Sequence, residues 1–328
     1  MSFDLRYHPC VEQRALADSF NDSLNALLPL DRLHGCQGES EEVWAQLDDI
    51  GLFTICVDQD AGGSGLGAAE EALIVMALGR RLASPAVMAS IGATDADAIT
   101  ELAEPARTGR TAAAYRHGDR IVLVGDDQAG TILLRDGARA ALHRHAGIKG
   151  LVDAHLWRES LHEGIAPQSS IAEFDDKGLL RLQLIVAAAL AGLGATALEA
   201  AVAYASERRQ FGRAIGGFQA VKHHCANMAI AARNARDQVG FASVAIDEDR
   251  EDAALQVECA LLVAGTAALR NAATSIQIHG GIGFSEEALP HMVLKRAQVL
   301  IAIAGGLEAS NERVAAASTG SNVRRSHA

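Results

Sequence analysis

The 328-residue sequence is poor in aromatic side chains and cysteine, and it has no excess of positive charge. Only 4% of its residues are aromatic, whereas β-rich proteins depend on aromatic and β-branched side chains, so helices are favoured over a sandwich or barrel. Its five cysteines are scattered, which argues against a disulfide frame or zinc site and fits a reducing compartment. The net charge of -12 repels nucleic-acid phosphates, so no nucleic-acid partner is expected.

One long apolar stretch, residues 182–205, imitates a membrane span because Glu199 is its only charged residue. The stretch is rich in alanine and glycine and runs directly into charged residues, so we expect a helix buried in a bundle or subunit interface. The first ten residues lack a basic segment followed by an apolar one, so no signal peptide is expected. We therefore predict a cytoplasmic protein without a membrane span.

Changes in hydrophobic periodicity divide the chain into three parts. Residues 1–103 have helical spacing, with Ser40 as a helix N-cap and a break at a loop that contains four glycines, residues 60–67. Residues 104–178 lose the helical period, and their apolar runs at 121–125 and 131–134 predict a hairpin in a small β-containing module.

The last part, residues 179–328, returns to long helices joined by short glycine-containing loops. Helices are expected at residues 179–208, 218–247 and 253–278, with a fourth inside 289–317. The fold class predicted is mainly α: a helical N-terminal domain, a reduced β-containing or irregular middle module, and a C-terminal four-helix bundle.

The segment Arg208-Arg209-Gln210-Phe211-Gly212 falls at the predicted end of a helix. An arginine beside a glycine break can donate two parallel hydrogen bonds to a pyrophosphate, and a phenylalanine can cover an apolar ring face. The same residues also suit an ordinary helix end, with favourable cations and a terminating glycine. Taken alone, the segment leaves both interpretations open.

A second segment, residues 277–284, places Gln277 before the three glycines Gly280, Gly281 and Gly283. Glycines let backbone N–H groups approach an anion closely, and a glutamine side chain can pair with an adenine edge or a pyrophosphate oxygen. No strand precedes the segment and no Lys-Ser/Thr pair follows, so it is neither a Walker loop nor a dinucleotide-binding fingerprint. A tight turn between helices is the alternative interpretation.

Together, the two segments resemble the acyl-CoA dehydrogenase family. Residues 205–229 look like the family's C-terminal helical domain, and residues 277–284, with Pro290 and Arg296 after them, look like its second signature. Residues 47–67 also resemble its N-terminal part, as do Ala77-Leu78-Gly79-Arg80, whereas the likeness fails mainly in the middle of the chain. In this family, one subunit's arginine and Gln-Gly-Gly segments bind the ADP part of FAD, whose flavin lies in a neighbouring subunit.

The resemblance implies FAD as cofactor, an acyl-CoA thioester as substrate, and an electron-transfer acceptor. It also implies a homo- or hetero-oligomer, a dimer or tetramer, with an acyl-CoA dehydrogenase-like subunit. By motif position, the residues implied to contact FAD are Arg208, Gln210, Phe211, Ile215, Phe218, Gln219, Gln277, Gly280 and Gly281.

The sequence departs from the family where a catalytic base is needed to remove a proton from the acyl Cα. Gly305 stands where most members carry the glutamate, and Thr266 stands where a subset carries it, so neither position supplies a base. Glu308 is a weak stand-in, because a carboxylate at a helix start is ordinarily solvated. Glu258 precedes Thr266 by eight residues, roughly 12 Å along a helix, which is too far to replace it simply.

The middle module also departs from the family. The flavin-facing pattern survives only as residues 103–110, the Lys-x-Trp-Ile-Thr/Ser segment that covers the isoalloxazine is missing, and the β-region looks several strands short.

Three hypotheses about the function follow. The first is a base-lacking subunit of a heteromeric enzyme for steroid-derived or other bulky acyl-CoA. The second is a self-sufficient homo-oligomeric dehydrogenase with a relocated base, and the third a non-catalytic structural homologue.

Overall fold

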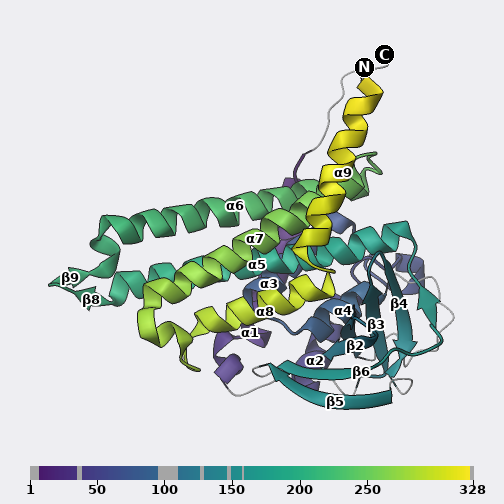
Figure 1. Cartoon of the computed structure of the whole chain (residues 1–328), viewed down its shortest axis with the longest axis horizontal. Helices are drawn as coiled ribbons and strands as arrows, with labels where there is room; N and C mark the ends of the chain where they lie inside the picture. The colour runs from purple at the N-terminus through teal and green to yellow at the C-terminus, as the bar shows by residue number, and fades with distance from the viewer. Residues whose placement is uncertain are drawn as a thin grey trace.

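The computed structural model describes residues 7–34, 39–94, 110–125, 129–145, 149–156 and 159–325. Long helices run side by side through the molecule, a β-sheet covers one end of them, and a small hairpin extends from the other end (Figure 1). This arrangement confirms the mainly α fold class with a small sheet in the middle of the chain.

The N-terminal part is helical, as expected. Ser40 caps the second helix, because its hydroxyl accepts a hydrogen bond from the Val43 amide at 3.3 Å. A glycine-rich loop precedes the third helix, and a proline at the first turn starts the fourth. The helices are α1 (Val11–Leu27), α2 (Glu41–Asp49), α3 (Ala68–Arg80) and α4 (Pro85–Ala93).

The middle part forms one seven-stranded sheet in the order β5-β6-β2-β1-β3-β4-β7. Its strands are β1 (Thr111–His117), β2 (Arg120–Val124), β3 (Thr131–Asp136), β4 (Arg139–Arg144), β5 (Lys149–Leu156), β6 (Glu159–Ile165) and β7 (Ala172–Glu173). The expected hairpin between the two apolar runs is wrong: β1 lies between them, antiparallel to β2 and parallel to β3. The preceding strand has few large apolar residues, so its part in the pairing left no local signal.

The C-terminal part confirms three long helices, with ends close to those expected. The fourth expected helix is two, because Gly305 and Gly306 adopt positive φ of 88° and 89° and turn the chain. The elements are α5 (Asp176–Glu207), β8 (Arg209–Gln210), β9 (Arg213–Ala214), α6 (Gln219–Asp247), α7 (Ala253–His279), α8 (Leu289–Ile303) and α9 (Leu307–Arg325).

Helix α5 is the central element, and small residues let α3 lie directly against it. A Cβ on Gly192 would fall 2.2 Å from the Met76 carbonyl oxygen, and a Cβ on Gly79 would fall 2.2 Å from that of Ala189. The segments Asp176–Glu207 and Ala253–Phe284 are each apolar and long enough to cross a bilayer. Within Asp176–Glu207, 72% of an apolar 18-residue stretch is buried inside the chain, which agrees with the expected core helix.

Candidate functional site

The first predicted segment forms a hairpin beyond the end of α5 (Figure 1). Strands β8 and β9 are joined by Phe211 and Gly212, which both have positive φ, 50° and 79°. Two consecutive residues with positive φ form a tight hairpin turn whose twist matches that of the two strands. A phenylalanine in this left-handed conformation is strained by about 1–3 kcal/mol. Its side chain is 91% exposed, so the fold holds Phe211 in a costly conformation facing solvent.

The aromatic and cationic side chains of this hairpin lie against one another. The Arg213 guanidinium lies 4.0 Å from the Phe218 ring centroid, and Phe211 meets the same ring edge-on at 6.1 Å. The Arg208 amide donates to the Tyr204 carbonyl, while the exposed Arg208 side chain extends from the helix end. The Arg208 side chain is therefore presented outward by a rigid turn.

The second predicted segment lies beside the first at the same end of the bundle. The Tyr204 ring, one turn before Arg208, stacks on the His279 ring with 4.2 Å between centroids. His279 ends α7, and Gly280 follows with φ 65° and ψ -143°, a conformation that favours glycine. A Cβ on Gly280 or Gly281 would meet nothing within 4 Å, so the backbone there is open to a ligand.

Most of the predicted cofactor residues are exposed, and the Tyr204–His279 contact brings the ends of their two segments together. Arg208, Gln210, Phe211, Gln219, Gln277, Gly280 and Gly281 are exposed, and Ile215 and Phe218 are partly buried. Ile282 and Phe284, which are 50% and 73% exposed, add apolar surface next to them. A guanidinium, three carboxamides and exposed backbone amides fit the polar demands of an ADP group. The surface is open, so a second surface is needed to enclose such a ligand.

Arg296, which belongs to the second signature, lies elsewhere. It is buried on α8 and donates hydrogen bonds to the Leu82 carbonyl, at 2.9 Å, and to the Ala83 carbonyl. The guanidinium therefore fixes α8 against the turn between α3 and α4 and is not available at the exposed surface.

The two family base positions lie near each other without a carboxylate. Gly265 sits so close to the α8–α9 turn that a Cβ on it would fall 2.7 Å from Leu307 Cδ2. Thr266 is its neighbour on α7, and Gly305 precedes Leu307 by two residues. Glu308, the weak stand-in, is solvent-exposed. The turn consequently supplies no acid-base group from either position.

Glu258 is engaged by residues of α9. Its carboxylate accepts hydrogen bonds from Arg313 Nε at 2.6 Å and Nη2 at 3.1 Å, and also from the Ser310 hydroxyl. The residue is only 9% exposed. This ion pair joins α7 to α9 and leaves the carboxylate engaged.

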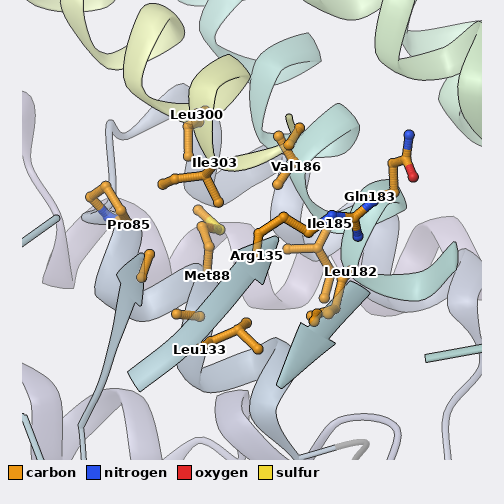
Figure 2. Close-up of a pocket in the computed structure, with 14 residues that line it drawn as sticks. Pro85, Met88, Leu133, Arg135, Leu182, Gln183, Ile185, Val186, Leu300 and Ile303 are labelled. Carbon is orange, nitrogen blue, oxygen red and sulfur yellow. The ribbon is translucent and has the colours of Figure 1, made fainter. Parts of the chain in front are cut away.

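A largely apolar cavity lies between α4, the sheet, α5 and the end of α8 (Figure 2). It has about 530 Å³ of empty space, part of which is open to solvent, and Ala304 beside Gly305 forms one edge. Its lining includes Met88, Leu182, Ile303 and other apolar side chains, and the polar groups among the described lining residues are Arg135 and Gln183. No carboxylate lines it within the described part of the chain.

No feature of the sequence marked Arg135 as a cavity residue. A single arginine after an apolar run looks like the solvated end of a strand, whereas the structure leaves it 9% exposed. Helices that pack over the sheet enclose Arg135, and no local sequence pattern records that packing. The expected flavin-facing remnant, residues 103–110, lies outside the described residues except for Arg110, which donates to the Glu39 carbonyl at 3.1 Å.

Comparison with known families accounts for most of the chain. Residues 11–108 match the family described as acyl-CoA dehydrogenase, N-terminal domain, and residues 177–319 match acyl-CoA dehydrogenase, C-terminal domain. Among curated proteins, the chain is similar to acyl-CoA dehydrogenase IpdE2 of Mycobacterium tuberculosis, with 29% identity over 80% of this chain and 81% of the relative.

Solved structures share the fold. The ChsE4-ChsE5 complex from Mycobacterium tuberculosis contains a chain that superposes with a TM-score of 0.72 at 20% identity, covering 95% of this chain and 98% of that one. A variant of the steroid ACAD Tcur3481-Tcur3483 gives the same TM-score, identity and coverage. At these identities the likeness establishes the fold alone.

Proposed function

Because the chain belongs to the acyl-CoA dehydrogenase family, we propose that it is the base-lacking subunit of a heteromeric dehydrogenase for bulky acyl-CoA thioesters. The family reaction removes a proton from the acyl Cα and passes a hydride from Cβ to FAD. A partner subunit of the same family supplies the base and the flavin pocket. This chain contributes the exposed Arg208 and Gln277 surface that closes around the ADP half of FAD.

One observation carries the proposal: the residues proposed to contact FAD are present and mostly exposed, whereas neither family base position has a carboxylate. Gly305 and Thr266 lie at neighbouring places with no carboxylate, and Glu258 is engaged by Arg313. An isolated chain of this kind lacks the family's carboxylate for removing the proton at both of these positions. By contrast, the exposed surface formed by Arg208, Gly280 and Gly281 has the guanidinium and the backbone amides that an ADP group requires.

The need for a partner is supported by the surface itself. Phe211, Ile282 and Phe284 are all at least half exposed and lie at the same end of the bundle as Arg208. Clustered exposed apolar side chains mark interaction surfaces. A second subunit that covers them would also shield the diphosphate from water and so strengthen its pairing with Arg208.

The fold shared with the ChsE4-ChsE5 complex supports an oligomer of related chains. The likeness to a steroid ACAD supports a bulky substrate.

Flavin stoichiometry tests the proposal. The chain is purified alone, and it is also purified after co-expression with a candidate acyl-CoA dehydrogenase-like partner that carries the family glutamate. We expect little flavin absorbance and no acyl-CoA turnover from the chain alone, and stoichiometric FAD with turnover from the pair. The partner purified alone is the control. A full complement of FAD with turnover from the isolated chain would refute the proposal.

A further inference from the structure

An open groove is lined by four helices, α1, α3, α5 and α6. Two adjoining hollows form it, with about 1190 and 840 Å³ of empty space that is partly open to solvent. It is separate from the proposed ADP surface, because on α6 it begins at Ala229, roughly 15 Å of helix beyond Gln219. The residues that line both hollows are Arg14, Leu73, Met76, Arg233 and Arg236.

The floor of the groove is apolar and consists mainly of small residues. Ala77 of α3 and Ala191 and Gly192 of α5 are buried there. Leu198 continues the floor along α5, and Val202, which is four residues further on the same face, is 43% exposed. Small residues let the backbone of a partner approach closely, and an exposed apolar strip marks an interaction surface.

The exposed edges of the groove are positively charged. Arg14 of α1 and Arg236 of α6 are both solvent-exposed, and no carboxylate forms an ion pair with either one within the described part of the chain. Asp18 is the one unpaired carboxylate among the described lining residues, so the groove keeps a positive charge on a chain whose net charge is -12. The lining pairs that neutralise each other, at 2.5 and 2.6 Å, are Arg80–Glu199 and Arg233–Asp237.

These features define the kind of occupant that fits. Ligand pockets for small molecules enclose most of the ligand, whereas Arg14 and Arg236 stand in solvent. An extended peptide would leave its backbone N–H and C=O groups unpaired, because no strand edge is among the described lining residues. A helix satisfies its own backbone hydrogen bonds and can combine an apolar face with charged flanks.

We propose that the groove between α1 and α6 docks an acidic amphipathic helix of another protein. The apolar face of that helix packs on the alanine-rich floor, and its carboxylates lie beside Arg14 and Arg236. The inference goes beyond the function proposed above and needs neither FAD nor the hairpin surface. Because the two arginines are exposed, their attraction for the helix weakens as salt is added.

Fluorescence anisotropy of the purified full chain with two labelled helical peptides, each about three turns long, tests the groove. The peptides share one face of leucine and alanine, and their flanking positions carry glutamate in one and lysine in the other. At low salt we expect the glutamate peptide to bind at least tenfold more tightly. Arg14→Glu combined with Arg236→Glu should reverse that preference. Ala229→Trp, which fills the groove from an exposed position, should weaken binding of both peptides.

Arg139→Glu combined with Arg144→Glu is the matched control, because both residues are exposed on β4, outside the groove, and the charge change is the same. This control should keep the preference for the glutamate peptide. Equal binding of the two peptides, binding of neither, or a preference that survives Arg14→Glu with Arg236→Glu would overturn the proposal. Sedimentation of the chain alone checks for a second copy in the groove. Self-association that is lost in Arg14→Glu with Arg236→Glu would also overturn the proposal, since the groove would then join copies of this chain.

Discussion

The two ends of the central helix α5 differ in what they leave unfinished. At its C-terminal end, Arg208 and the glycines after α7 form an open surface that has polar groups for a ligand but no walls. Near its N-terminal end, the cavity has walls on several sides and one buried cation, but no acid-base group among its described lining residues. The first end needs a second surface to enclose a ligand, whereas the second end is already largely enclosed.

The contrast extends to the backbone conformations at the two places. Gly280 adopts a conformation that favours glycine although nothing in the chain occupies the space a side chain would take. Phe211 is held strained and exposed. Such features cost stability, and they are retained where something outside the chain benefits from them. Gly305, in contrast, leaves an open turn where the family places its base.

The largest effect should come from Arg208→Ala. In the co-expressed complex, loss of charge-assisted hydrogen bonds worth about 1.5–3 kcal/mol should weaken FAD retention by at least tenfold. Flavin absorbance after dialysis measures the loss, and far-UV circular dichroism checks the fold. Arg233→Ala, an exposed arginine on α6, is the control and should keep its flavin. Undiminished flavin in Arg208→Ala would show that the surface at the C-terminal end of α5 does not bind FAD.

A smaller effect is expected from Gly281→Ala. The added Cβ meets nothing within 4 Å in the isolated chain, so the thermal midpoint of the chain alone should not change. If the backbone approaches a diphosphate, the methyl group disturbs one hydrogen bond, about 1 kcal/mol or roughly fivefold in FAD affinity. Flavin titration of the complex measures it. Gly130→Ala, which also meets open space, is the matched control, and equal behaviour of the two variants would contradict an approach at Gly281.

The smallest effect should come from Glu308→Gln. Glu308 is exposed at the start of α9, so its loss should change turnover of the complex by less than about twofold, within the ±0.5 kcal/mol typical of surface substitutions. Steady-state kinetics with an acyl-CoA substrate provide the measurement. Abolished turnover with FAD still bound would instead establish a relocated base and favour the self-sufficient homo-oligomer.

Helices were predictable from the sequence because their signals are local and repeated. The start of α2 follows from Ser40 and the apolar spacing after it, and α5 follows from a long run that only burial can explain. The gathering of Arg208 and Gln277 followed only from resemblance to a family. The structure supports it through the contact between Tyr204 and His279, which neither motif contains.

Other features were out of reach because they depend on distant packing. β1 pairs in parallel with β3, with Ala113 opposite Leu133, although β2 separates the two strands in the sequence, and no local pattern specifies that register. Arg135 becomes buried only when helices pack over the sheet. The two glycines Gly305 and Gly306 are visible in the sequence, but glycine is also tolerated inside a continuous helix at some cost in stability, so the pair did not establish a break between α8 and α9.

The exposed hairpin also bears on how long a solitary copy of this chain survives. A strained turn with a bare phenylalanine offers chaperones and proteases the kind of apolar handle by which they recognise unassembled proteins. Burial of that handle in an assembled enzyme would remove it. Cellular abundance of the chain should then follow the supply of whatever covers the hairpin, so that quality control keeps the two in step.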